Sequence, residues 1–357
     1  MTRKLLAVWV AAILALLCAG TAVFAAQSGP LAAIVEGAKK EGTVSIKLHP
    51  GLAGKGIERL KRGVAERYGV NLQIAFVPSA SYPVALAKAA FEHKAGAPPS
   101  FDLLPFDDAN LAQAVSAGIV EKVDWKPLLA PGTPPQAVHV NGYALSTHTN
   151  HIGLVYNPAV ISAPVAPKSL RDLTNPKWRG KIIIFPYTNL YLGYSIVLGV
   201  DQTLAILREI MKNKPTVEIY ARGLTRYMAG EYPLLLTSSG FFTEIKRQRV
   251  PAQWNSLDVS FSTIHAAVIL KGARHPNAAK LVALYLASPE GHKLMLEEAA
   301  EGSIFYPANI EQEIVQEDSR RGLKVYNPTA WPGALDLLLS PKGAQVEQEI
   351  GRILRSR

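Results

Sequence analysis

Short apolar runs and helix-length stretches alternate along the first third of the chain, and this alternation restricts the fold more than any other feature. The apolar runs at 44–48, 70–77 and 101–106 are followed by stretches of helical character at 57–68, 82–95 and 109–117. Gly118, directly after the last stretch, is typical of a glycine that ends a helix. Strands separated by helices are expected to pair in parallel under a helical cover. The sequence therefore predicts an α/β fold with mostly parallel sheets and flanking helices.

The first 25 residues have the composition of a secretory signal peptide. Arg3 and Lys4 precede an apolar stretch at 5–17, and 23–25 places small residues at −3 and −1 of a cleavage site. A retained transmembrane helix is the alternative, but the apolar stretch is shorter than the roughly 20 residues that a span needs. We expect residues 1–25 to be removed and the product to be periplasmic.

Cys18 is the only cysteine of the chain, and Leu17 stands before it, where a lipid-modification site has a small residue. The sequence thus favours a soluble product without a lipid anchor, a disulfide or thiolate chemistry. The formal charge falls from +10 to +8 when Arg3 and Lys4 are removed. A positive surface attracts nucleic acid, anionic membranes or anionic solutes, and secretion argues against a nucleic-acid partner.

Residues 167–185 contain, in succession, a short predicted helix, a turn and a buried strand. Ser169 and Asp172 have the spacing of a capping box, and Pro176 ends the helix that they open. The apolar run at 182–185 follows as a strand. This order of elements resembles a signature segment of extracellular solute-binding proteins of the ferric-iron type, the receptors that supply ABC importers.

A second segment, from His275 to Gly302, also resembles that family, and the similarity covers nearly the whole mature chain. The resemblance implies a two-lobed type II periplasmic-binding-protein fold with hinge crossovers. It also implies a monomer that binds a small-molecule solute without a cofactor and docks on ABC permease subunits. About 330 mature residues exceed what one core usually holds, which agrees with two lobes.

In that fold the chain crosses between the lobes twice, here at the extended segment 143–157 and again near 262–270. The resemblance assigns 26–147 plus 264–305 to the first lobe, and 148–263 plus 306–357 to the second.

The loops that follow the strands are expected to meet at a crevice between the lobes, where helix N-termini leave backbone N–H groups free. For each residue of such a loop, ordinary helix or turn capping is the alternative to ligand binding. The residues that we expect to bind the ligand are His49, Ser79, Ser81, Tyr82, Asp107, Asn150, His151, Tyr187, Thr188, Asn189, Ser238, Ser239, Phe241 and Phe242.

Iron-binding members of the family hold ferric ion with adjacent tyrosine phenolates after the strand that corresponds to 232–237 here. This sequence has Phe241 and Phe242 at that place, and phenylalanine has no oxygen to offer a hard cation. The departure predicts no metal site and an organic solute. A rearranged iron site that uses His49, Tyr187, Tyr191 and Tyr194 is the alternative.

Three further histidines have different expected roles. His148 and His151 are three residues apart in an extended segment, which points them to opposite faces, and we expect His148 to be structural. His265 faces either the crevice or the core. The positive charge of the chain and its hydroxyl and amide loops favour an acidic solute, although no arginine falls in the assigned loops.

A secreted hydrolase is the competing class of function, since a fold alone does not fix an activity. The sequence contains no Gly-x-Ser-x-Gly or His-Glu-x-x-His motif, and no phosphate loop of an ATPase. Ser239, His265 and Asp258 could form a triad only if the fold brought them together. We therefore predict a binding protein and not an enzyme; a receptor that signals to a membrane sensor instead of a permease stays an open alternative.

Overall fold

The computed structural model describes residues 29–79 and 81–356. The expected signal peptide at 1–25 lies outside these residues. Within the described part of the chain, no helix has both the length and the apolar character needed to cross a bilayer.

All strands of the described residues join in one 11-stranded sheet with the order β2-β1-β3-β10-β5-β8-β6-β7. β4 and β9 pair with β5 beside this path, and β11 pairs with β10. The strands are β1 (Thr43–Leu48), β2 (Gln73–Pro78), β3 (Leu103–Asp107), β4 (Val138–His139), β5 (Ala144–Tyr156), β6 (Ile182–Ile184), β7 (Thr216–Val217), β8 (Leu234–Ser238), β9 (Gln253–Asn255), β10 (Ser260–Ile269) and β11 (Val325–Tyr326).

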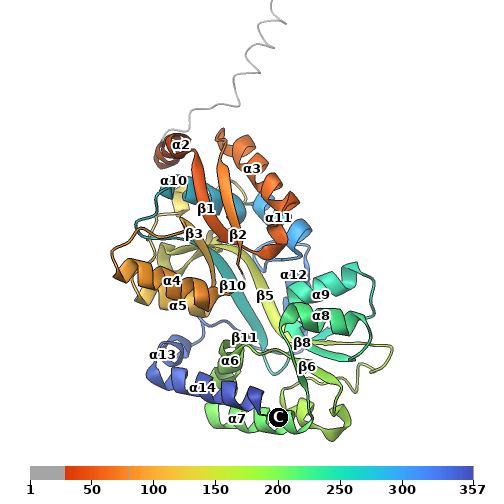
Figure 1. The fold of residues 1–357 in the computed structure, drawn as a ribbon. Coiled ribbons are helices and arrows are strands. Elements are labelled where there is room, and N and C mark those ends of the chain that lie inside the picture. The colour runs from red at the N-terminus through yellow and green to blue at the C-terminus, as the bar shows by residue number, and fades with distance from the viewer. Residues whose placement is uncertain (1–28, 80, 357) are drawn as a thin grey trace, which may run out of the picture.

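The two ends of the sheet are parallel and its centre is antiparallel. β1 pairs in parallel with β2 and β3, and β6 pairs in parallel with β7 and β8. β5 and β10 run antiparallel to each other through the middle of the molecule, with Ile264 opposite Thr149 (Figure 1). Their register shifts at a bulge between His265 and Ala266.

Helices cover both faces of the β1-β2-β3 end. On one face lie α2 (Pro30–Glu41), α3 (Lys55–Tyr68), α10 (Pro276–Ala287) and α11 (Pro289–Ala299), and on the other lie α4 (Tyr82–Lys94) and α5 (Asp108–Ser116). Because strand side chains alternate, Leu103 packs in the first of these cores and Leu104 in the second.

The β6-β7-β8 end has the same two-sided cover. α6 (Thr188–Leu198), α7 (Val200–Lys212) and α14 (Pro341–Arg355) lie on one face, and α8 (Tyr220–Met228), α9 (Ser239–Arg247) and α12 (Ile310–Arg320) lie on the other (Figure 1). The short α13 (Ala334–Leu338) packs beside α14 and α6. Ile182 and Ile184 face one core and Ile183 the other. Buried apolar residues thus gather separately at each end of the sheet, while the lobe boundaries given above stay a prediction.

The sequence from Leu190 to Met211 predicts a single helix, and this prediction is wrong. Two helices, α6 and α7, occupy this stretch, and Gly199 separates them. Gly199 has φ 92° and ψ 145°, a backbone conformation that residues with a side chain rarely adopt and that no helix continues through. The strand expected at 70–77 also begins later, at Gln73.

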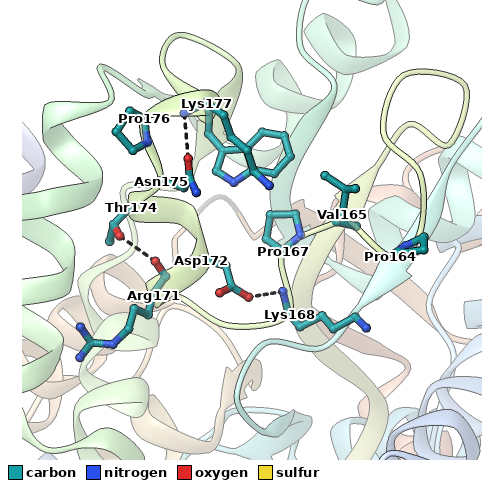
Figure 2. A pocket seen from close by; sticks show the side chains of 12 residues that line it. Pro164, Val165, Pro167, Lys168, Arg171, Asp172, Thr174, Asn175, Pro176 and Lys177 are labelled. Carbon is teal, nitrogen blue, oxygen red and sulfur yellow. Dashed lines mark hydrogen bonds between the residues drawn. The ribbon is translucent and has the colours of Figure 1, made fainter.

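The capping box that the sequence predicts is confirmed, although it opens only a 3₁₀ turn, Arg171–Thr174. Ser169 Oγ accepts a hydrogen bond from the Asp172 backbone N–H (3.1 Å), and Asp172 Oδ2 accepts one from Ser169 N (3.0 Å). Figure 2 shows the further bond from Lys168 N to Asp172 Oδ2 (2.8 Å), in a surface pocket that both residues line. The motif therefore satisfies its own polar groups and has a structural role.

Gly193 tests how closely α6 packs on the central strands. A Cβ at this position would lie 2.5 Å from the Phe261 ring of β10, which is itself buried against Tyr326. We expect Gly193→Ala to lower the free energy of unfolding by about 1–3 kcal/mol, because the buried ring has little room to move. Urea unfolding followed by circular dichroism measures the change. Gln202→Ala, on the exposed side of α7, should stay within about 0.5 kcal/mol of wild type; equal midpoints for both variants would contradict the close packing.

Candidate functional site

A cavity of about 440 Å³ lies between the two ends of the sheet. Its wall is built by residues that follow β1, β2, β3, β6, β7 and β8 and by side chains of β5 and β10. Because the strands at each end are parallel, their carboxyl ends deliver these loops to the same place. The topology therefore makes the cavity the natural binding site of the fold.

Most of the residues expected at the crevice do line this cavity; whether they bind a solute stays a prediction. The lining residues among them are His49, Ser79, Ser81, Tyr82, Asp107, Asn150, Tyr187, Asn189, Ser238 and Phe241. Four expected residues do not line it: His151, Thr188, Ser239 and Phe242.

The His151 side chain points away from the cavity toward α12, and Ser239 bonds to the backbone of β5. The His151 side chain is fully buried, and its Nδ1 lies 2.7 Å from Glu311 Oε2. Ser239 Oγ accepts a hydrogen bond from the His151 backbone N–H (2.9 Å). The expectation that both residues face the crevice is wrong, because the alternation that turns Asn150 toward the cavity turns His151 away.

Phe242 and Thr188 also point elsewhere. Phe242 is 6% exposed and packs against Trp254 with ring centroids 5.6 Å apart, in the core under α9. Successive helix residues differ by about 100° in direction, so Phe241 reaches the cavity and its neighbour does not. Thr188 begins α6 on the side of α14, where its Cγ2 lies 3.6 Å from the position of a Cβ on Gly351.

Several lining residues were not among the expected set, and His148, Tyr220 and Glu301 are among them. His148 was expected to have a structural role, but it lines the cavity. Because His148 and Asn150 are two residues apart in a strand, they point to the same face, and this spacing could have predicted the position of His148. Tyr220 follows β7, and the two residues of β7 are too few to form a sequence pattern that predicts a strand. Glu301 follows α11 and carries no local signal. His265, which the sequence left between crevice and core, also lines the cavity.

Glu301 joins segments that are far apart in the sequence. His49 Nδ1 accepts a hydrogen bond from Gly51 N (3.1 Å), so His49 Nε2 carries the hydrogen and donates it to Glu301 Oε1 (3.2 Å). The Asn150 amide is assigned the orientation in which its nitrogen donates to Glu301 Oε2, at 2.6 Å, and to Thr149 O, at 3.1 Å. A Cβ on Gly240 would lie 2.7 Å from each carboxylate oxygen, so the charge sits at the N-terminal turn of α9, where the helix dipole favours it.

Two histidines of the cavity, His148 and His265, are held neutral by burial. The His148 and His265 rings stack with centroids 4.4 Å apart, and His49 meets His148 edge-on at 5.8 Å. Burial lowers the pKa of His148 well below its ordinary value, and His265 and His49 lower it further. Burial also lowers the pKa of His265, whose Nδ1 lies 3.1 Å from the Tyr82 hydroxyl. The two stacked rings therefore bring no positive charge to the cavity at neutral pH.

Tyr187, Tyr220 and Phe241 form an aromatic wall on the opposite side. The Tyr220 ring centroid lies 4.7 Å from that of Tyr187 and 5.3 Å from that of Phe241. Burial raises the pKa of both tyrosines, so both hydroxyls keep their protons. The Tyr220 hydroxyl is buried and has no hydrogen-bond partner within the described residues.

The structure does not assemble the rearranged iron site. Tyr191 donates its hydroxyl hydrogen to Phe185 O (3.1 Å), and Tyr194 packs against Phe261. Both tyrosines are buried in the core of their end of the sheet and do not line the cavity. Within residues 29–79 and 81–356, no group of three or more His, Cys, Asp or Glu side chains is arranged to hold a metal ion.

The triad drawn from the sequence is not assembled either. Ser239 Oγ accepts its bond from His151 N, and Asp258 Oδ2 accepts one from Leu170 N (2.7 Å). His265 contacts Tyr82, not Ser239 or Asp258.

The neutral state of His148 makes the stability of the fold depend on pH. Its pKa in the folded protein is lowered, so its contribution is complete above the ordinary value of 6.5 and is lost as the pH falls toward the folded pKa. We expect each such histidine to remove about 1.4 kcal/mol of unfolding free energy per pH unit in this window. Urea unfolding at pH 7.5, 6.0 and 5.0 measures the slope.

His148→Asn should have a shallower slope than wild type, since the unfolded variant gains one proton fewer. His93→Asn, which changes an exposed histidine of α4, should keep the wild-type slope. Equal slopes for His148→Asn and wild type would show that His148 takes up its proton without unfolding.

Comparison with known proteins gives a family and a set of similar folds. The family model described as bacterial extracellular solute-binding protein matches residues 65–313. Iron-bound HitA from Pseudomonas aeruginosa is 18% identical with a TM-score of 0.63, over 88% of this chain and 99% of that one. A periplasmic thiamin binding protein is 14% identical with a TM-score of 0.67, over 88% and 96%. The Atu4243-GABA receptor is 15% identical with a TM-score of 0.66, over 88% and 98%. No curated protein matches the sequence.

Proposed function

Because this chain belongs to the family of bacterial extracellular solute-binding proteins, we propose that it is the periplasmic solute receptor of an ABC importer. It captures a small organic solute in the cavity and delivers it to the permease subunits in the membrane. The observation that carries the proposal is the cavity itself, whose wall comes from both ends of the sheet. The protein acts as a monomer after removal of residues 1–25, and it catalyses no reaction.

A solute in this cavity contacts both ends of the sheet at once, which is what links binding to a change of shape. Asn189 Nδ2, at the start of α6, donates to Asp107 Oδ2 at the end of β3 (3.4 Å), so the two sides meet across the cavity. A micromolar solute supplies about 8 kcal/mol of binding free energy, and turning a mostly open ensemble into a mostly closed one needs about 5.5 kcal/mol of preference. Ordinary affinity therefore suffices to signal occupancy to the permease.

An organic solute fits the cavity better than ferric iron. Phe241 stands in the wall and offers no oxygen, and the tyrosines beside it keep their protons because burial raises their pKa. A volume of about 440 Å³ suits a small molecule more than a bare ion. Among the similar structures, one is named for thiamin, one for GABA and one for its bound iron, so this fold accommodates both kinds of cargo.

The proposed function is tested by a thermal-shift screen of the protein after removal of any bound ligand. The probes are ferric citrate, carboxylates, phosphonates, polyamines and sugars. We expect an organic solute to raise the melting temperature, because binding to the folded state alone stabilises it by about 2.7 kcal/mol at 100 times the Kd. A large shift with ferric ion, together with the reddish absorption of a phenolate–iron complex, would contradict the organic assignment.

Phe241 and Phe242 provide a matched pair of variants. Phe241→Ala should raise the Kd of the best solute of the screen while leaving unfolding near wild type, because this half-buried ring faces the cavity. Phe242→Ala should instead cost about 3–5 kcal/mol of stability, because it leaves a hole against Trp254. Calorimetric titration and urea unfolding measure the two effects.

Asn189→Ala should also weaken binding, since its amide lies at the cavity beside Asp107. Unchanged affinity in both Phe241→Ala and Asn189→Ala would place the binding site elsewhere.

A further inference from the structure

We propose that the solute carries an organic cationic group, a protonated amine or a quaternary ammonium, held between Asp107 and the aromatic wall of Tyr187, Tyr220 and Phe241. The inference rests on the proposed function, because it names the class of solute that the same cavity takes. It goes against the acidic solute that the overall charge of the chain favours.

The charge of the cavity is opposite to that of the chain. Asp107 and Glu301 line it, whereas lysine and arginine are absent from the described lining residues. A third carboxylate, Glu347 of α14, lies near Asp107. Burial raises the pKa of Glu347, and the negative charge of Asp107 raises it further. An anionic solute would meet these carboxylates without a cationic side chain to balance it, and the repulsion would be strong in a site shielded from water.

Glu301 and Asp107 differ in how far the protein already satisfies them. Glu301 holds His49 and Asn150 and fills the place at the α9 N-terminus where an anionic group of a ligand would otherwise sit. Asp107 Oδ1 accepts bonds from the backbone and side chain of Asn110 at 2.9 and 2.7 Å. From the described residues its Oδ2 accepts one long bond, 3.4 Å from Asn189, so this oxygen can take a stronger N–H donor from a solute.

The aromatic wall supplies the second half of a cation site. The faces of aromatic rings attract cations, and the attraction grows where water is excluded. The wall presents three neighbouring rings: the Tyr220 centroid lies 4.7 Å from that of Tyr187 and 5.3 Å from that of Phe241.

The N-termini of α4 and α8 also face the cavity, and neither has a side-chain cap. Their N–H groups suit a carboxylate. A solute that carries both an amine and a carboxylate is therefore compatible with the inference, and a solute with only anionic groups is not.

The inference is tested with pairs of probes that differ mainly in charge. Choline is compared with 3,3-dimethyl-1-butanol, putrescine with 1,4-butanediol, and 4-aminobutyrate with butyrate, by thermal shift and calorimetric titration on the ligand-free protein. We expect at least one cationic member to bind, and to bind at least about tenfold more tightly than its partner without the cation. Binding of glucose, citrate or a phosphonate alone would overturn the inference and leave the proposed function standing. No stabilisation by any of these solutes would count against both.

Two variants of the cavity separate the two halves of the cation site. Asp107→Asn keeps a side-chain oxygen for the cap of α5 and removes the charge, so the Kd of the best cationic probe should rise at least about tenfold. Phe241→Leu keeps apolar volume and removes the ring face, and the same Kd should rise about 3- to 30-fold. Asp201→Asn, an exposed carboxylate on α7, is the matched control and should bind as wild type. Unchanged affinity in both cavity variants would overturn the inference.

Discussion

The antiparallel pairing of β5 with β10 is the constraint on which the rest of the structure depends. Every residue of β5 is buried, although the middle of the strand, 146–151, is polar throughout. Unpartnered polar groups cost about 1–3 kcal/mol each when buried, so this stretch needs partners. Thr147 Oγ1 donates to His265 O (3.2 Å), and Thr149 Oγ1 accepts from Ile304 N (2.8 Å). These bonds fix the polar stretch between the apolar cores at the two ends of the sheet.

The same alternation along β5 divides its polar side chains between two tasks. His148 and Asn150 turn toward the cavity, while His151 turns to Glu311 on the other side. The opposite faces of His148 and His151 were predicted correctly from their spacing. On the cavity side, burial keeps the stacked imidazoles and the tyrosine hydroxyls neutral, whereas two carboxylates line the cavity without a lysine or arginine among the described lining residues. In this member of the family of bacterial extracellular solute-binding proteins, the cavity is therefore lined by acidic side chains although the chain as a whole is positively charged.

The sequence was sufficient for the fold, and for the part of the site that follows directly from strand ends. The α/β class and the type II periplasmic-binding-protein fold are confirmed, because strand and helix periods differ clearly along 44–118. His49 and Asp107 were found at the cavity because each stands where a parallel strand ends. The sequence could not show that Phe241 lines the cavity and Phe242 does not, because this depends on the residue at which α9 begins. Glu301 reaches His49 only through tertiary packing, so no local pattern indicates it.

The two ends of the sheet are joined by the long paired strands β5 and β10 and by the irregular segment 300–309 between α11 and α12. A twist of β5 and β10 about their long axes would widen the cavity without breaking their ladder of hydrogen bonds. The irregular step between His265 and Ala266 lies at the cavity, and bulges concentrate twist. For the function proposed above, the twist of this strand pair would connect occupancy of the cavity to the shape that the permease contacts.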